Sequence, residues 1–179
     1  MSKAFYDEQS GRVIVRGLRV KPGQSDFKFK NFTGEQSDRN NSGSRNFCVL
    51  ISEEDAKTIT EALEKAGFFL NIKEYNGEYY FKVLFGTKFP PEVSKKKIMP
   101  NGRVFRTIIE EENYGKLQNA LIAECDISCT PTFLAKRNTW TCYLNKFNFV
   151  PLVDPLERED EAIDAAEAEF PTEDEVPFE

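Results

Sequence analysis

Residues 69–85 read FLNIKEYNGEYYFKVLF, and this stretch predicts two antiparallel strands joined by a tight turn. Asn76-Gly77 is the strongest short-range hairpin signal, because both residue types accept the positive φ angles of a type I′ turn. The flanking residues are rich in aromatic and aliphatic side chains, which favours strands over residues 69–75 and 78–85. The sequence therefore places a β-hairpin near the middle of the chain.

Alternation within residues 79–85 assigns the two faces of the second strand. Successive strand side chains point to opposite faces. Residues 79, 81, 83 and 85 are all apolar, so we expect this face in the core. The opposite face carries Tyr80 and Lys82, which we expect to point into a groove on the outside.

Further short strands are predicted on both sides of this hairpin. Alternating or β-branched patterns mark residues 12–20, 27–32, 46–51, 103–109, 126–135 and 139–150. Neither face of the last strand is uniformly apolar, so its orientation stays open. Residues 33–44 have the composition of a loop, and residues 87–102 are expected to form a loop or an irregular edge segment.

One clear helix is expected between the strands. It begins at Ser52, a favourable N-cap that precedes three acidic residues, and it ends at Gly67. A second, short helix is expected around residues 116–123. Many short strands with few helices are typical of a closed or partly closed β-barrel.

The charge of the chain is divided between two segments. Residues 154–179 contain twelve acidic residues and one basic residue, Arg158, and so carry −11. Because the whole chain carries −6, residues 1–153 carry +5. We therefore expect a basic folded domain, residues 1–153, and a disordered acidic tail, residues 154–179. This division suggests that the body binds a polyanion and that the tail competes for the same surface.

The composition argues against several classes of site. The chain contains no histidine, which removes the commonest general base and every histidine-containing metal site. Cys125 and Cys129 form one close pair, whereas structural zinc sites usually show two. Together with Cys48 and Cys142, they are best interpreted as buried thiols, so we expect no metal and no cofactor.

The sequence also bears on the compartment of the protein. No run approaches the roughly 18 to 20 apolar residues that span a membrane. The N-terminal residues lack the apolar core of a signal peptide. We therefore expect a cytoplasmic protein without a membrane partner.

Aromatic and basic residues are interleaved in several predicted strands and loops. Such a pattern suits unpaired nucleic-acid bases, because cations contact the phosphates while flat side chains stack on the bases. Most of the sixteen phenylalanines are needed for the core, and a solvated loop accounts equally well for the lysine run at residues 95–97. The candidate contacts are Lys28, Lys30, Arg39, Arg45, Tyr80, Lys82, Lys95, Lys96, Lys97, Arg103, Arg106, Lys136, Arg137, Trp140, Tyr143 and Lys146.

Two sequence motifs resemble a known family. Asp174-Glu175-Val176-Pro177-Phe178 is similar to the acidic tip of bacterial single-strand binders, which docks partner proteins. Asn31-Phe32-Thr33-Gly34, followed by Arg45-Asn46-Phe47-Cys48-Val49, looks like a pattern of phage replication proteins. The chain thus resembles bacteriophage-type single-stranded DNA-binding proteins, which have an OB-fold and an acidic C-terminal tail.

The resemblance implies both a fold and a function. The implied fold is mainly β: an OB-fold-like five-stranded barrel with extra strands or hairpins and one or two short helices. The implied function is non-enzymatic coating and protection of single-stranded DNA in replication, recombination or repair. The tail would recruit a polymerase, helicase or primase. A homodimer is compatible with this expectation, as is a location in the cytoplasm of a host cell.

Two other functions stay open at this point. The acidic tail could mimic nucleic acid and block a host enzyme, although such an inhibitor has little use for a body that carries +5. A nuclease is the other alternative, and it would need clustered carboxylates in the body to hold Mg²⁺. The acidic runs at residues 53–55 and 110–112 are more simply interpreted as a helix start and a solvated turn.

Overall fold

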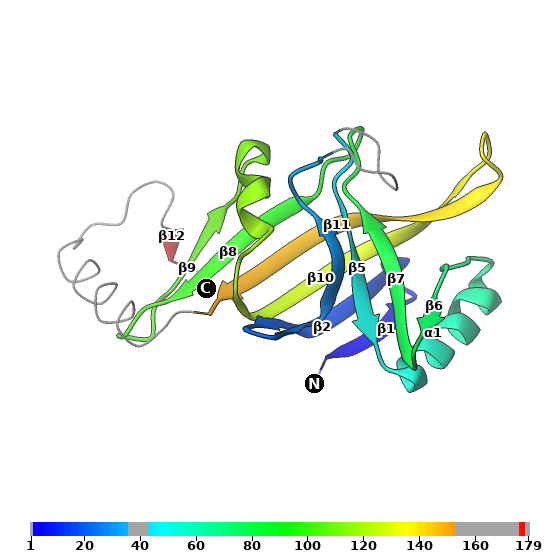
Figure 1. The fold of residues 1–179 in the computed structure, drawn as a ribbon, viewed down its shortest axis with the longest axis horizontal. Coiled ribbons are helices and arrows are strands. Elements are labelled where there is room, and N and C mark those ends of the chain that lie inside the picture. The colour runs from blue at the N-terminus through cyan, green and yellow to red at the C-terminus, as the bar shows by residue number, and fades with distance from the viewer. Residues whose placement is uncertain (1, 36–42, 153–175, 178–179) are drawn as a thin grey trace.

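Two thirteen-residue strands, β10 (Ile122–Leu134) and β11 (Thr139–Pro151), form the long antiparallel hairpin around which the fold is built. The computed structural model describes residues 2–35, 43–152 and 176–177. Figure 1 shows this hairpin crossing the molecule, with its turn projecting beyond the other strands. Both strands were expected from the sequence, and both extend beyond the predicted ranges.

The remaining strands are added to the two edges of this hairpin. On the side of β10 lie β2 (Arg12–Lys21) and then β1 (Lys3–Asp7). On the side of β11 lie β7 (Glu78–Leu84), β5 (Asn46–Ile51) and β4 (Phe27–Asn31). Two short strands, β3 (Gln24–Ser25) and β6 (Lys73–Tyr75), pair with β2 and β7.

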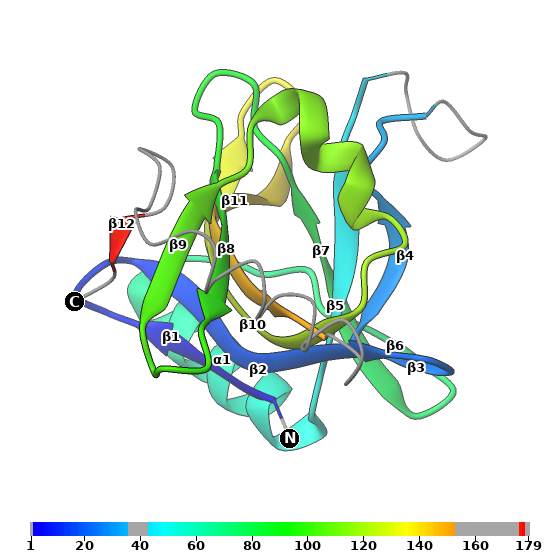
Figure 2. The ribbon, with the colours of Figure 1, turned by 90° about the vertical axis from the view of Figure 1, so that its left-hand side faces the viewer.

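The sheet curves so that β4, at one end, approaches β2, the strand next to the other end. The backbone N–H of Asp26, just before β4, donates to the carbonyl of Arg19 in β2 at 2.9 Å. The Asp26 carboxylate in turn accepts the Arg19 N–H at 2.8 Å. Figure 2 shows the strands wrapping around a common centre. The result is a mainly β, partly closed barrel, as expected.

The helix α1 (Glu53–Ala66) has the predicted boundaries. The Ser52 hydroxyl accepts the N–H of Asp55 at 3.1 Å, and Gly67 ends the helix with a left-handed φ of 82°. Its apolar side packs towards the core, and the carboxylate of Asp55 accepts the N–H of Ala4 in β1 at 2.9 Å. Among the described residues, no helix is both long and apolar enough to cross a bilayer.

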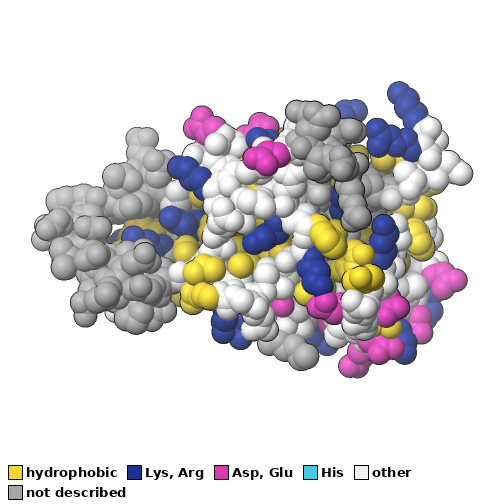
Figure 3. Space-filling model, viewed as in Figure 1, with side chains coloured by type: hydrophobic (Ala, Val, Ile, Leu, Met, Phe, Trp, Pro, Cys, Tyr) yellow, Lys and Arg dark blue, Asp and Glu magenta, His cyan; other side chains and the backbone are white. Residues whose placement is uncertain are grey.

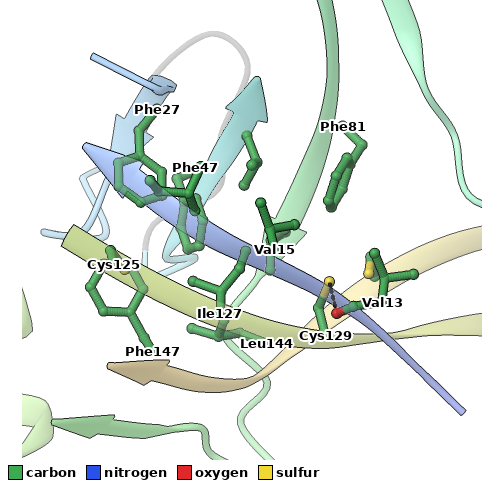
Figure 4. Packing of buried hydrophobic residues seen from close by; sticks show 14 of the residues in the cluster. Val13, Val15, Phe27, Phe47, Phe81, Cys125, Ile127, Cys129, Leu144 and Phe147 are labelled. Atoms are coloured by element: carbon green, nitrogen blue, oxygen red, sulfur yellow. Dashed lines mark hydrogen bonds between the residues drawn. The ribbon is translucent and has the colours of Figure 1, made fainter. Parts of the chain in front are cut away.

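Phenylalanine rings fill the interior of the barrel. Phe47 is fully buried and lies 5.2 Å from Phe27, 5.4 Å from Phe32 and 5.8 Å from Phe147, measured between ring centroids. Figure 4 shows Phe27, Phe47 and Phe147 packed beside residues of β2 and β10. These rings come from β4, β5 and β11 and the residue after β4, so the core holds the two halves of the sheet together.

The burial of β7 follows the predicted alternation. Phe81 and Val83 are buried, whereas Lys82 is exposed and Tyr80 is half-buried on the other face. This strand pairs along its whole length with β5, with Tyr80 opposite Leu50 and Lys82 opposite Cys48. The expected inner and outer faces are therefore confirmed.

A β-bulge explains why the last strand showed no uniformly apolar face. In the pairing of β10 with β11, Ser128 lies opposite Lys146 and Cys129 lies opposite Leu144, so Asn145 has no counterpart. Inserting one residue reverses the direction in which later side chains point. Even-numbered residues are buried before the bulge and odd-numbered residues after it.

The interpretation of residues 87–102 as a loop or an irregular edge segment is wrong for residues 92–98. Residues Glu92–Ile98 form β8, which pairs in parallel with β11 and antiparallel with β9 (Val104–Ile108). The strand was not predicted because three consecutive lysines show no alternation of apolar and polar residues. Pairing on both sides supplies its backbone hydrogen bonds. Figure 1 shows the β8–β9 hairpin extending away from the barrel. On the outer edge of β9, Val176–Pro177 forms β12.

Two local predictions also need correction, and two more strands were missed. The strand expected at residues 69–75 is limited to β6, because Leu70 is buried in the core before pairing begins. The helix expected around residues 116–123 is a 3-10 helix at Glu111–Leu117. Its buried residues Tyr114 and Leu117 are three apart, as three residues per turn require. The strands β1 and β3 were not predicted.

Candidate nucleic-acid interface

A groove of about 770 Å³ lies on the outer side of the barrel wall formed by β4, β5 and β7. It is lined by residues of these strands and of β11, together with segments 69–73 and 115–119. Figure 3 shows hydrophobic and basic side chains side by side on this face, over β5 and β7. The groove therefore combines the two side-chain types that the sequence analysis singled out.

Four of the predicted contacts meet in this groove. Tyr80 and Lys82 reach it because they occupy the outer face of β7, and Lys30 reaches it from β4. Trp140 enters from the beginning of β11. These residues are up to 110 positions apart in the sequence. They are brought together because β7 pairs with β5 and β11, and β5 pairs with β4.

Two further aromatic residues line the groove and were not among the predicted contacts. Phe29 is 63% exposed and Phe69 is 50% exposed. The ring centroid of Phe29 lies 5.9 Å from that of Tyr80, with the ring planes inclined at 60°. Regular alternation over residues 27–32 would place Phe29 on the same face as buried Phe27, so its exposure could not be predicted from that pattern.

The electrostatics of the groove favour an anion. Among the described residues that line it, three are basic, namely Lys30, Lys73 and Lys82, and one is acidic, Glu35. Burial lowers the pKa of Lys30. At the base of the groove, burial raises the pKa of the Cys48 thiol, and the charges of Lys82 and Lys73 oppose this shift. Lys82 and Lys73 are therefore close enough to Cys48 for their charges to affect its thiol.

Five predicted residues gather instead on the β8–β9 hairpin. The guanidinium of Arg103 lies 5.2 Å from the centroid of the Phe105 ring. Arg106 forms an ion pair with Glu92 across the hairpin. Lys95, Lys96 and Lys97 follow one another along β8. The backbone of β12 pairs beside these charges, with Val176 opposite Arg106 and Pro177 opposite Phe105.

Two more predicted residues, Lys136 and Arg137, lie in the turn between β10 and β11. The turn stands next to an aromatic pair, since the ring centroids of Phe133 and Trp140 are 5.4 Å apart. Trp140 thus connects this turn to the groove.

Four other predicted residues lie outside the groove. Lys146 is exposed on β11, and Tyr143, on the same strand, pairs with Leu84 of β7. Lys28 forms an ion pair with Glu78. Arg45 contacts the 3-10 helix instead.

Arg45 connects three parts of the body. Its Nε donates to the carbonyl of Phe32 at 3.1 Å, and its Nη1 donates to Glu111 at 3.0 Å. The guanidinium also lies 5.6 Å from the centroid of the Tyr114 ring. Burial, together with nearby carboxylates, raises the pKa of that tyrosine. These contacts hold the 3-10 helix against the barrel.

Some predicted residues fall outside the described part of the chain. They are Arg39 in the polar loop and Asp174, Glu175 and Phe178 in the tail. The pairing of Val176 and Pro177 with β9 concerns their backbone.

All four cysteines are buried, and none of them forms a disulfide. Burial raises the pKa of Cys125 and of Cys142, and Cys142 also contacts Cys129. Within residues 2–35, 43–152 and 176–177, no three metal-ligating side chains form a group that could hold an ion.

No protein-family model matches this chain, and neither does any curated protein sequence. Its fold, in contrast, matches solved structures. The single-stranded DNA-binding protein from bacteriophage Enc34 in complex with ssDNA aligns with a TM-score of 0.51 at 10% identity, covering 82% of this chain and 90% of that one. Another structure of that protein aligns with a TM-score of 0.50 at 11% identity, covering 86% and 92%. The OB-fold-like barrel with added strands, expected from the resemblance, is thereby confirmed.

Proposed function

We propose that this chain is a non-enzymatic single-stranded DNA-binding protein. The observation that carries the proposal is the groove in which Tyr80 and Trp140 lie with Lys30 and Lys82. The fold gives independent support, because a solved structure with the same fold is described as a complex with ssDNA. A replication, recombination or repair role in the cytoplasm of a host cell is part of the proposal.

The two kinds of side chain have different tasks. Lysine ammonium groups neutralise phosphates and release the counterions that surround them, so affinity falls as salt rises. Aromatic rings accept the faces of bases, and each stacked base contributes roughly 1–3 kcal/mol whatever its identity. In a duplex, base faces are covered by their neighbours, so this groove selects unpaired strands without reading their sequence.

The acidic tail, residues 154–179, competes with DNA for the basic body. A random coil of 26 residues has an r.m.s. length of roughly 25–30 Å, enough to reach across a small domain. Tethering raises its effective concentration to about millimolar. The pairing of β12 with β9 supports this step, because it places the backbone of Val176 and Pro177 on the basic hairpin.

Displacement of the tail by DNA frees its tip for other proteins. The tip, residues 174–178, is then available to a polymerase, helicase or primase. Residues 1–153 act as the binding domain in this scheme, and residues 154–179 act as the partner-binding segment. A homodimer is also proposed, and its mass in solution can be measured by light scattering.

Trp140 provides the test of ssDNA binding. It is the single tryptophan of the chain and lines the groove, so stacking on a base should quench its fluorescence. Titration with oligo-dT should give saturable quenching that high salt reverses. Absence of both quenching and a gel shift in dilute buffer, with residues 154–179 removed, would refute the proposal.

The inhibitor and nuclease alternatives are less well supported by the groove. A nucleic-acid mimic would act through its acidic tail and has no use for exposed rings beside lysines. A nuclease would degrade labelled oligo-dT when Mg²⁺ is added, and we expect the oligonucleotide to stay intact.

A further inference from the structure

Phe29 has a backbone conformation that phenylalanine rarely adopts. Its φ angle is +51°, in the left-handed region. Two other described non-glycine residues have positive φ, Asn76 and Asn138, and both are asparagines in hairpin turns, where this conformation is favoured. Phe29 lies within β4, so turn chemistry does not account for it.

A β-bulge imposes this conformation. In the pairing of β4 with β5, Lys28 lies opposite Cys48 and Asn31 lies opposite Asn46. Phe29 and Lys30 therefore share a single counterpart on β5. When the first residue of such a bulge is left-handed, it is usually a glycine, because a side chain makes that conformation unfavourable.

The core explains the bulge but not the ring. The extra residue shifts the alternation so that both Phe27 and Phe32 are buried, at 3% and 1% exposure. Glycine or asparagine at position 29 would give the same shift with less backbone strain. The Phe29 ring is 63% exposed, so it adds little to the core. Something other than folding must therefore account for a phenylalanine at this position.

The surroundings of the ring indicate what that is. Phe29 lines the groove, where its centroid lies 5.9 Å from that of Tyr80. Lys30, the next residue, lines the groove as well. One bulge thus brings an aromatic residue and a lysine, adjacent in the sequence, to the same groove.

We propose that Phe29 is a base-stacking residue, which the strained bulge turns out of the core to form one aromatic platform with Tyr80. Its ligand is an unpaired base, and Lys30 contacts the adjoining phosphate. This inference rests on the proposed function and adds a specific contact to it. Strain retained at a binding position is consistent with a role outside the core.

Replacing Phe29 with glycine separates binding from stability. Phe29→Gly removes both the stacking surface and the left-handed strain. Affinity for oligo-dT should fall roughly 5- to 150-fold, the loss of one stacked base. The melting temperature should stay the same or rise by up to about 4 °C. If Phe29 were needed for the fold, the replacement would instead lower both the affinity for oligo-dT and the melting temperature.

A matched pair of leucine variants controls for the loss of a surface aromatic. Phe29→Leu keeps apolar bulk without an aromatic face and should also weaken binding. Phe89 is 77% exposed but is not among the residues that line the groove, so Phe89→Leu should bind like the native chain. Phe29→Tyr keeps the aromatic face and should bind within about twofold of native.

The outcomes are distinguishable. If the native chain binds oligo-dT and Phe29→Gly binds it equally well, the inference about Phe29 is overturned while the proposed function stands. Equal losses in Phe29→Leu and Phe89→Leu would overturn it as well. Failure of the native chain to bind oligo-dT would overturn the proposed function, and this inference with it.

Discussion

Tyr80 and Lys82 are two residues apart on β7, so they point to the same side and line the same groove. Their pairing with β5 fixes both positions on a strand rather than on a mobile loop. The two side chains nevertheless act on different parts of a nucleic acid. Replacing each in turn separates stacking from charge neutralisation.

Tyr80→Leu should weaken binding of oligo-dT by roughly 5- to 150-fold at every salt concentration, because a stacking surface is lost. Lys82→Gln should weaken binding mainly at low salt and reduce the slope of log affinity against log salt by about 0.7. Fluorescence anisotropy over a range of salt measures both. Lys65→Gln, in the last turn of α1, is the matched control; an equal change of slope there would contradict a specific role for Lys82.

At the residue level, sequence reasoning succeeded where strand alternation was regular. Tyr80 and Lys82 were assigned to the outer face of an uninterrupted strand. Phe29 was missed because the bulge in β4 has no signature in the alternation of residues 27–32. Arg45 was predicted as a phosphate contact, but its partners Phe32 and Glu111 come from distant segments. Residue type alone does not reveal such contacts.

At the level of elements, local signals predicted local structures. The Asn76-Gly77 turn and the Ser52 and Gly67 ends of α1 each depend on a few neighbouring residues, and all were correct. The strand β8 could not be predicted in this way, since its stability comes from pairing with β9 and with the distant β11. Bulges are hidden for the same reason, because register is a property of two strands.

The β8–β9 hairpin should contribute to retention of the tail. Replacing Lys95, Lys96 and Lys97 with glutamine removes three charges from the strand adjoining β9, with which β12 pairs. We expect the difference in oligo-dT affinity between full-length and tail-deleted protein to shrink. Fluorescence anisotropy in dilute buffer measures the oligo-dT affinity of the native and the triple-variant protein, each with and without the tail.

A control with the same net charge makes this result specific. Lys3, Lys57 and Lys65 lie on β1 and α1, which do not pair with β12. Their replacement with glutamine should leave the effect of tail deletion unchanged. If both triple variants behave alike, net charge rather than the hairpin governs the tail.

At the level of the whole molecule, the two segments carry opposite charges, and this division was visible in the sequence. The mainly β barrel was also predicted, because many short strands around one helix allow few architectures. A groove beside Tyr80 and Lys82 was expected, but its full lining was not, since it depends on how strands from separate parts of the chain lie together.

Deleting residues 154–179 should tighten binding of oligo-dT, most strongly at low salt, because a competing anion of charge −11 is removed. A tail of the same length with its twelve acidic residues changed to asparagine and glutamine should behave like the deletion. Unchanged or weaker affinity after deletion would rule out competition. A neutral tail that inhibits as strongly as the native one would show that bulk, not charge, is responsible.

The most direct test of the account compares two oligonucleotides with identical phosphates, oligo-dT and an abasic strand of equal length, on the tail-deleted chain. If the groove holds unpaired bases on its aromatic residues, the abasic strand should bind at least about tenfold more weakly at the same salt concentration. Equal affinity for the two strands would mean that the body recognises phosphates alone, and would contradict the central claim.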